Sequence, residues 1–126
     1  MIQRSEAILD RVGLLAHRDT PAQDLAYGQQ RALELGVTLS MEPRLVLLDE
    51  PTAGMSRQET NDAIEMIQRV TADIACVIIE HDMNVIFSLA HRIAVLHYGV
   101  ILACGPPEEI RNDQRVKDAY LGEETQ

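Results

Sequence analysis

The sequence predicts an α/β protein in which short strands alternate with helices and form a mostly parallel sheet flanked by helices. Two continuous apolar runs, LVLL at residues 45–48 and CVII at residues 76–79, are typical of strands buried on both faces of a parallel sheet. Hydrophobic residues make up 46% of the 126 residues, enough for a packed core, and aromatic residues only 3%, so we expect an aliphatic core. Polar residues follow both runs directly, and the carboxyl ends of parallel strands are where α/β proteins place their chemistry.

The first third of the chain is expected to be mainly helical. Residues 5–12 have apolar side chains at helical spacing, and Gly13 is a plausible stop for this helix. Residues 17–24 are polar and are interrupted by Pro21, which predicts a loop. The residues that follow, 29–41, favour a second helix.

Ser56 and Glu59 have the spacing of a capping box, in which the serine caps the N-terminus of a helix and the glutamate reaches back to it. The helix predicted there carries one apolar stripe, formed by Ala63, Ile64, Ile67 and Val70. Later elements are expected in this order: a helix at residues 83–90, strands at 93–96 and 100–103 joined by a turn at Tyr98 and Gly99, a helix from Pro106, and a helix at 114–121 with Gly122 as its stop.

The charge and the cysteines argue against several classes of protein. A formal net charge of -9 disfavours a general affinity for nucleic acid, because binding to phosphates needs clustered lysine and arginine. Cys76 and Cys104 lack the spacing of a zinc site, and Cys76 lies in an apolar run that predicts a buried free thiol. The sequence has no signal peptide and no apolar stretch of about 18 residues, so we expect a cytosolic chain that does not itself span the membrane.

Asp49 and Glu50 are adjacent carboxylates at the end of the first predicted strand. Successive strand residues point to opposite sides, so the two side chains are expected to have different roles. One carboxylate could hold a hydrated magnesium ion, and the other could orient or deprotonate an attacking water. A strand that ends in a solvated acidic turn explains the same two residues equally well.

Two further features are suggestive but weak when taken alone. Gly28 lies where a loop leads into a helix, and the free N–H groups of a helix N-terminus suit an anion such as phosphate, although any such junction with a glycine looks similar. His81 follows the second predicted strand and could hydrogen-bond a phosphate oxygen. A lone histidine is more often structural, which is the interpretation given to His17, His91 and His97.

The order of these features resembles that of an ABC transporter ATPase. Residues 25–31, LAYGQQR, resemble the ABC signature motif, and residues 45–51 resemble the Walker B strand with its catalytic glutamate. Residues 52–56, TAGMS, resemble the D-loop region, and residues 79–83, IEHDM, resemble the H-loop that carries the switch histidine. The segments DEPTAGMS, IEHDM and GPPEEIRND…VKDAYLGEE resemble the ATPases of branched-chain amino-acid importers and their urea or amide relatives.

This resemblance covers essentially the whole chain and is most specific over residues 25–56. It implies the fold of the C-terminal part of a P-loop NTPase (RecA-like) ABC cassette, with a small C-terminal hairpin and helices. The implied segments are a remainder of the helical and signature subdomain at 1–41, the core strands at 42–105, and the C-terminal helices at 106–126.

The resemblance also assigns roles to individual residues. It implies that Glu50 and His81 are catalytic and that Asp49 holds Mg²⁺ through water. It implies that Ser56 belongs to the D-loop and that the signature residues contact the ATP of an opposite subunit: Leu25, Ala26, Tyr27, Gly28 and Gln29. The implied cofactors are ATP and Mg²⁺. The implied partners are a second ATPase subunit and transmembrane permease subunits, with the chain at the inner face of the plasma membrane.

The chain departs from the family pattern most clearly in having no G-x-x-x-x-G-K-[ST] loop; its single lysine, Lys117, has no glycine loop before it. We therefore expect poor ATP affinity from these residues alone, and we expect a sheet edge and an apolar face to be uncovered. Ala26 replaces the signature serine, and Ser56 replaces the D-loop aspartate. Three hypotheses follow: part of an importer ATPase that is inactive by itself, a binding module that donates its signature to a complete cassette, and a non-functional remnant.

Overall fold

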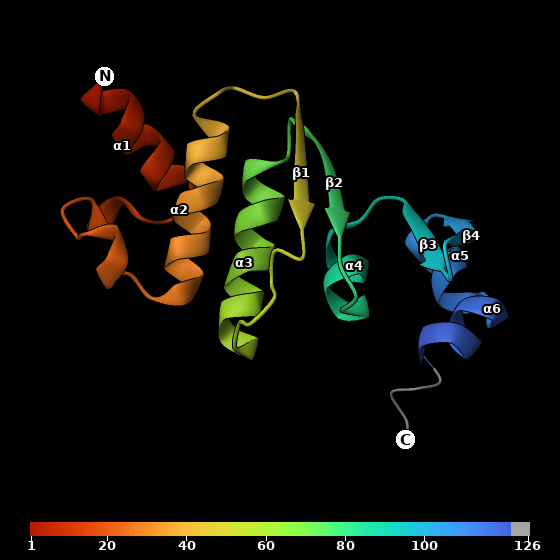
Figure 1. The fold of residues 1–126 in the computed structure, drawn as a ribbon. Coiled ribbons are helices and arrows are strands. Elements are labelled where there is room, and N and C mark those ends of the chain that lie inside the picture. Colours follow the sequence, from red (N-terminus) through yellow and green to blue (C-terminus); the bar gives the residue numbers. More distant parts are fainter. Residues whose placement is uncertain (122–126) are drawn as a thin grey trace. The chain divides into compact units, whose positions relative to one another are not determined.

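The computed structural model of the chain describes residues 1–121 and divides it into two units, Met1–Val85 and Ile86–Gln126. Helices and strands alternate along the sequence, as the apolar runs and helical stripes predict (Figure 1). The expected helix stop at Gly122 and the last residues of the predicted segment 106–126 lie outside the described residues.

The first unit is built from helices and one pair of strands. Its elements are α1 (Ile2–Arg11), two short 3-10 turns (Leu15–His17 and Ala22–Asp24), α2 (Tyr27–Leu39), β1 (Leu45–Asp49), α3 (Arg57–Val70), β2 (Ala75–Ile79) and the start of α4 (Met83–Leu89). The two 3-10 turns lie at the two ends of the stretch, residues 17–24, for which the sequence predicts a loop. The helix predicted from residue 29 begins two residues earlier, at Tyr27.

β1 and β2 are neighbouring parallel strands, which confirms the prediction made from their apolar runs. Their register pairs Leu45 with Ala75 at one end and Asp49 with Ile79 at the other. Figure 1 shows that α2 and α3 run opposite to the strands, so that the N-termini of both helices lie at the same end of the unit as the carboxyl ends of β1 and β2. The sequence-predicted site residues are concentrated at that end.

The capping box at the start of α3 is confirmed. The Ser56 hydroxyl oxygen accepts a hydrogen bond from the Glu59 N–H at 3.1 Å, and the Glu59 carboxylate accepts one from the Ser56 N–H at 3.2 Å. The helix then buries most of its predicted stripe, with Ile64 only partly covered. The aliphatic core of the unit comprises Val12, Leu14, Leu25, Ala32, Leu35, Leu39, Val46, Ala63, Ile67, Val70 and Val85.

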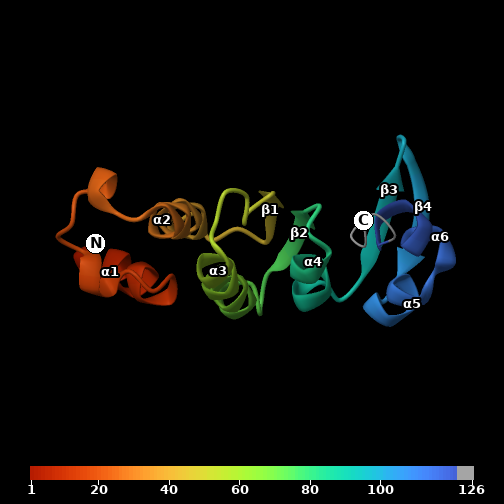
Figure 2. The same ribbon diagram turned by 90° about the horizontal axis from the view of Figure 1, so that it is seen from below.

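The continuous apolar runs of the two parallel strands predict burial on both faces, but only one face is buried. Val46 is 2% exposed, whereas its neighbour Leu47 is 71% exposed. Within the described part of this unit, α3 lies on one side of the strand pair and no element covers the other (Figure 2). The apolar side chains that share the open face are Leu45, Leu47, Val77 and Ile79. An apolar run shows that both faces are suited to burial, but it cannot show whether a second layer is present. The exposure of these four side chains confirms the prediction of an uncovered apolar face.

Cys76 of β2 is a free thiol that is half-buried rather than fully buried. This partial burial still raises the pKa of the Cys76 thiol, because desolvation disfavours the thiolate. None of the helices within residues 1–121 has the length and apolar character needed to cross a bilayer.

The second unit contains a β-hairpin and short helices. β3 (Ile93–His97) and β4 (Val100–Gly105) pair antiparallel around the predicted turn, where Tyr98 (φ 48°) and Gly99 (φ 76°) both adopt the left-handed conformation that two-residue hairpin turns favour. α5 (Pro107–Asn112) and α6 (Gln114–Val116) follow, and a π-helical turn (Lys117–Leu121) continues the last predicted helix. The buried apolar residues of this unit are Ile93, Val95, Ala103, Ile110 and Val116.

The open face of the strand pair gives the first testable prediction. We expect Leu47→Thr to change the free energy of unfolding by less than about 0.5 kcal/mol, because the side chain is already in water, and to reduce self-association of the chain. The matched control, Val46→Thr, buries a hydroxyl on the covered face of the same strand and should cost about 1–3 kcal/mol. Denaturant unfolding and sedimentation velocity measure the two effects. Equal destabilisation by both variants would contradict the exposure of one face.

Candidate functional site

Glu50 and His81 come together at the carboxyl ends of the parallel strands. The Glu50 N–H donates a hydrogen bond to the Ile79 carbonyl at 2.7 Å, which extends the pairing one residue beyond β1. The Glu50 carboxylate oxygen then lies 2.9 Å from Nδ1 of His81. Both side chains are largely exposed, so this pair of groups is open to a ligand.

The contact with Glu50 changes the acid–base behaviour of His81. The hydrogen bond to Glu50 and then the negative charge of Glu50 raise the pKa of His81, while partial desolvation opposes the rise. The charges of Glu80 and Asp82 contribute less and also raise it. The folded chain therefore favours the protonated imidazole more than an ordinary histidine does. Any stabilisation from this pair is fully present below the ordinary histidine pKa and is lost as the pH rises through the raised pKa.

The backbone of Glu50 adopts an unusual conformation. Its φ angle is 45°, in the left-handed region that residues with a side chain rarely occupy. Such a conformation costs on the order of 1–3 kcal/mol and persists when the surrounding structure requires it. Here it occurs where the chain leaves β1, at the residue whose carboxylate contacts His81.

Glu80 holds the turn that follows Glu50, a role that sequence reasoning missed. One Glu80 carboxylate oxygen accepts hydrogen bonds from the Thr52 N–H at 3.1 Å and from the Thr52 hydroxyl at 2.6 Å. Thr52 is a buried polar residue, only 8% exposed, so the carboxylate satisfies two donors that would otherwise be costly to bury. The available signal was an acidic residue directly after β2, at the same edge as the Pro-Thr step after β1.

Asp49 lies apart from this network. It is the last residue of β1, is exposed, and by the alternation of the strand shares the open face with Leu45 and Leu47. The two adjacent carboxylates thus have different surroundings, in line with the prediction of different roles. Residues 1–121 contain no group of three or more histidine, cysteine, aspartate or glutamate side chains placed to hold a metal ion.

The predicted signature segment forms the start of α2. Ala26 is the N-cap and has no side-chain acceptor, and the amide oxygen of Gln29 accepts a hydrogen bond from the Ala26 N–H at 3.0 Å. The amide nitrogen of Gln29 lies 3.1 Å from Nε2 of His17. Leu25 is buried beneath this junction. The first turn of α2 therefore presents backbone N–H groups at an exposed helix end.

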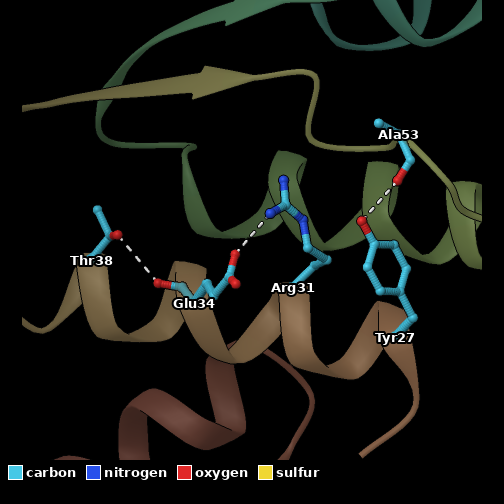
Figure 3. Close-up of polar contacts among 5 residues, drawn as sticks. All are labelled: Tyr27, Arg31, Glu34, Thr38 and Ala53. Carbon is cyan, nitrogen blue, oxygen red and sulfur yellow. Dashed lines mark hydrogen bonds and ion pairs between the residues drawn. The ribbon is translucent and has the colours of Figure 1, made fainter.

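Figure 3 shows the polar side chains on the side of α2 that faces β1 and α3. Arg31 pairs with Glu34 at 2.9 Å, and the Thr38 hydroxyl donates to the Glu34 carbonyl at 3.2 Å, so both contacts remain within the helix. The Tyr27 hydroxyl instead donates to the Ala53 carbonyl at 3.1 Å, in the turn between β1 and α3. Tyr27 therefore joins the signature segment to the predicted D-loop.

Glu59 contacts both Gly28 of the signature segment and Ser56 of the D-loop. A Cβ atom at Gly28 would lie 3.4 Å from the Glu59 side chain, so that the helix start packs closely against the capping box of α3. The oxygen of Ser56 already accepts the Glu59 N–H, and its hydroxyl proton remains able to donate. The predicted site residues thus have side-chain hydrogen bonds in two places, one between Glu50 and His81 and one between the signature segment and the D-loop.

Comparison with known proteins places these features in a family. The family model described as "ABC transporter" matches residues 1–53, and that described as "Branched-chain amino acid ATP-binding cassette transporter" matches residues 100–125. The high-affinity branched-chain amino acid transport ATP-binding protein LivG of Salmonella typhimurium is 41% identical over 124 residues, 97% of this chain and 49% of LivG. BraF of Pseudomonas aeruginosa, which bears the same description, is 40% identical over 117 residues, 91% of this chain and 46% of BraF.

Solved structures agree with the sequence comparison. MJ1267, an ATP-binding cassette of an ABC transporter, superposes with a TM-score of 0.83 at 27% identity, covering 94% of this chain and 49% of MJ1267. The fold and the strand-end residues thus define part of an ABC-type ATP-binding cassette. Over nearly its whole length the chain is similar to ATP-binding proteins of ABC transporters, and the relatives named above are of the branched-chain amino-acid type. The chain spans about half the length of the curated relatives that it matches.

The contact between Glu50 and His81 gives the second prediction. In an NMR titration of the imidazole signals, His81 should titrate above the ordinary histidine range, and Glu50→Gln should lower its pKa toward that range. Asp82→Asn should lower it less, because Asp82 contributes only a more distant charge. A His81 pKa that is unchanged by Glu50→Gln would show that the two side chains do not interact in solution.

Proposed function

We propose that this chain is the part of an ABC importer ATPase subunit that supplies the signature, Walker B, D-loop and H-loop residues. The observation that carries the proposal is the pairing of Glu50 with His81 at the carboxyl ends of two parallel strands, 2.9 Å apart and open to solvent. The family similarity supports the same assignment, because the segments that carry these residues resemble the Walker B strand and the H-loop of the relatives that the chain matches.

Glu50 would orient the water that attacks the terminal phosphate of ATP and accept its proton. A carboxylate can do this when it lies within hydrogen-bonding distance of the water, and Glu50 projects from the strand end with much of its side chain accessible. His81 would contact the terminal phosphate. Its raised pKa favours the protonated imidazole, which donates hydrogen bonds and carries the charge that opposes a phosphate.

Asp49 fits the role of a carboxylate that holds hydrated Mg²⁺. Magnesium in ATPases is bound through one or two carboxylates together with substrate phosphates and water, so a dedicated cage of protein ligands is not required. Asp49 is exposed at the end of β1, next to the residue that would orient the water. When bound, the ion would neutralise the charge of the phosphates.

Leu25, Ala26, Tyr27, Gly28 and Gln29 would face the ATP held by an opposite subunit, with Ser56 in the adjoining D-loop. The exposed N–H groups and the positive end of α2 suit a phosphate. A second ATPase subunit and the transmembrane permease subunits would be the partners, at the inner face of the plasma membrane. Branched-chain amino acids would be the transported substrates, by similarity to LivG and BraF.

The third prediction tests the catalytic role of Glu50 in a complete cassette that contains these residues and a phosphate-binding loop. Glu50→Gln should lower the rate of ATP hydrolysis at least about 100-fold, because the amide cannot accept the proton, while ATP affinity is retained. Phosphate release and nucleotide titration measure the two effects. The control is Glu65→Gln, an exposed glutamate on α3, which should hydrolyse ATP normally. Near-normal hydrolysis by Glu50→Gln would show that Glu50 is not catalytic and that Asp49 and Glu50 only form the polar end of a strand.

The fourth prediction concerns the 126 residues by themselves. They contain no G-x-x-x-x-G-K-[ST] loop, whose backbone N–H groups and lysine supply most of the phosphate contacts in P-loop enzymes. Calorimetric titration of this chain with Mg-ATP should therefore give no saturable binding. Micromolar affinity would contradict both the expectation and the proposed division of labour between the two halves of the cassette.

A further inference from the structure

A short path of hydrogen bonds runs from the signature helix to Glu50 within one chain. The Tyr27 hydroxyl donates to the Ala53 carbonyl at 3.1 Å. The N–H of the same residue, Ala53, donates to the Glu50 carbonyl at 3.1 Å. Ala53 alone therefore connects Tyr27, at the start of α2, with Glu50, the residue proposed to orient the attacking water. Figure 3 shows the first of these two hydrogen bonds.

The turn that contains Ala53 fits closely against the Tyr27 ring. Gly54 has a φ of 75°, and a Cβ atom built there would lie 3.6 to 3.8 Å from the ring atoms of Tyr27. A second backbone hydrogen bond, from the Met55 N–H to the Thr52 carbonyl at 3.2 Å, closes the turn. The ring and the hydroxyl of Tyr27 thus contact two consecutive residues of the turn.

Gly28, the next residue of α2, lies against the end of this turn that leads into α3. Gly28 packs on Glu59, and Glu59 is joined by two hydrogen bonds to Ser56. On its other side the turn is anchored by the two hydrogen bonds from Thr52 to Glu80. Since Glu80 fixes only the start of the turn, Tyr27 is the side chain placed to fix its middle.

We propose that Tyr27 is a positioning residue that holds the turn after Glu50 against the signature helix, and through Ala53 sets the place of Glu50 for hydrolysis. This inference rests on the proposed function, because it assigns Glu50 the attacking water. It adds that the segment facing one nucleotide and the carboxylate acting on another are mechanically joined within each subunit. Tyr27→Phe keeps the ring against Gly54 and removes only the hydroxyl that reaches Ala53.

The first arm of the test needs no nucleotide. In the nucleotide-free cassette, Tyr27→Phe should speed amide hydrogen exchange at Ala53 and Met55 about fivefold, the effect expected from losing one hydrogen bond. Replacement of Tyr27 by 4-aminophenylalanine, whose amino group can donate to the same carbonyl, should restore slow exchange. Tyr98→Phe is the matched control, since Tyr98 is 93% exposed at the turn between β3 and β4. Unchanged exchange in Tyr27→Phe overturns the proposal.

The second arm measures hydrolysis by the complete cassette. Tyr27→Phe should lower kcat about fivefold with little change in KM for ATP, because it removes only the hydroxyl, which is bonded to the Ala53 carbonyl of the same chain. Replacement by 4-aminophenylalanine should restore kcat. A normal kcat in Tyr27→Phe overturns the positioning role, as does a defect confined to KM. Normal hydrolysis by Glu50→Gln would instead defeat the proposed function, and the exchange arm would still decide whether Tyr27 holds the turn.

Discussion

The in-register parallel pairing of β1 with β2 is the constraint on which the site depends. It aligns Asp49 with Ile79, so that the next residues along each strand emerge side by side. Glu50 then bonds the Ile79 carbonyl through its backbone and His81 through its carboxylate. A shift of one residue in this register would turn every side chain to the other face and separate the groups that now meet.

The strands, the helices and the pairing partners could be predicted from the sequence because each rests on a local pattern. Continuous apolar runs indicated both strands, and the spacing of Ser56 and Glu59 indicated the start of α3. The apolar run alone could not predict the exposure of Leu47, because an apolar side chain is equally compatible with a covered and an uncovered face. The uncovered face was predicted instead from the missing G-x-x-x-x-G-K-[ST] segment. Local patterns indicate which secondary structure a segment favours, but they do not show whether a second layer covers it.

The residues of the candidate site could be predicted from the sequence, but most of the hydrogen bonds that join them to their surroundings could not. Glu50 and His81 were recognisable as polar residues after strands and as motif positions, and their contact followed from the parallel pairing. The bonds from Thr52 to Glu80 and from Tyr27 to Ala53 join residues 28 and 26 positions apart, and they depend on how a turn and a helix end fit together. No periodicity in the sequence encodes such a fit.

The left-handed conformation of Glu50 has a consequence for how this segment tolerates substitution. A glycine would adopt a φ of 45° without the strain that a side chain brings, so the backbone alone would be more relaxed with glycine at this position. The same change would remove the carboxylate that contacts His81. With the catalytic role proposed for Glu50, thermodynamic stability and activity would oppose one another at this position, and selection for a more stable backbone alone would favour a residue that lacks the carboxylate.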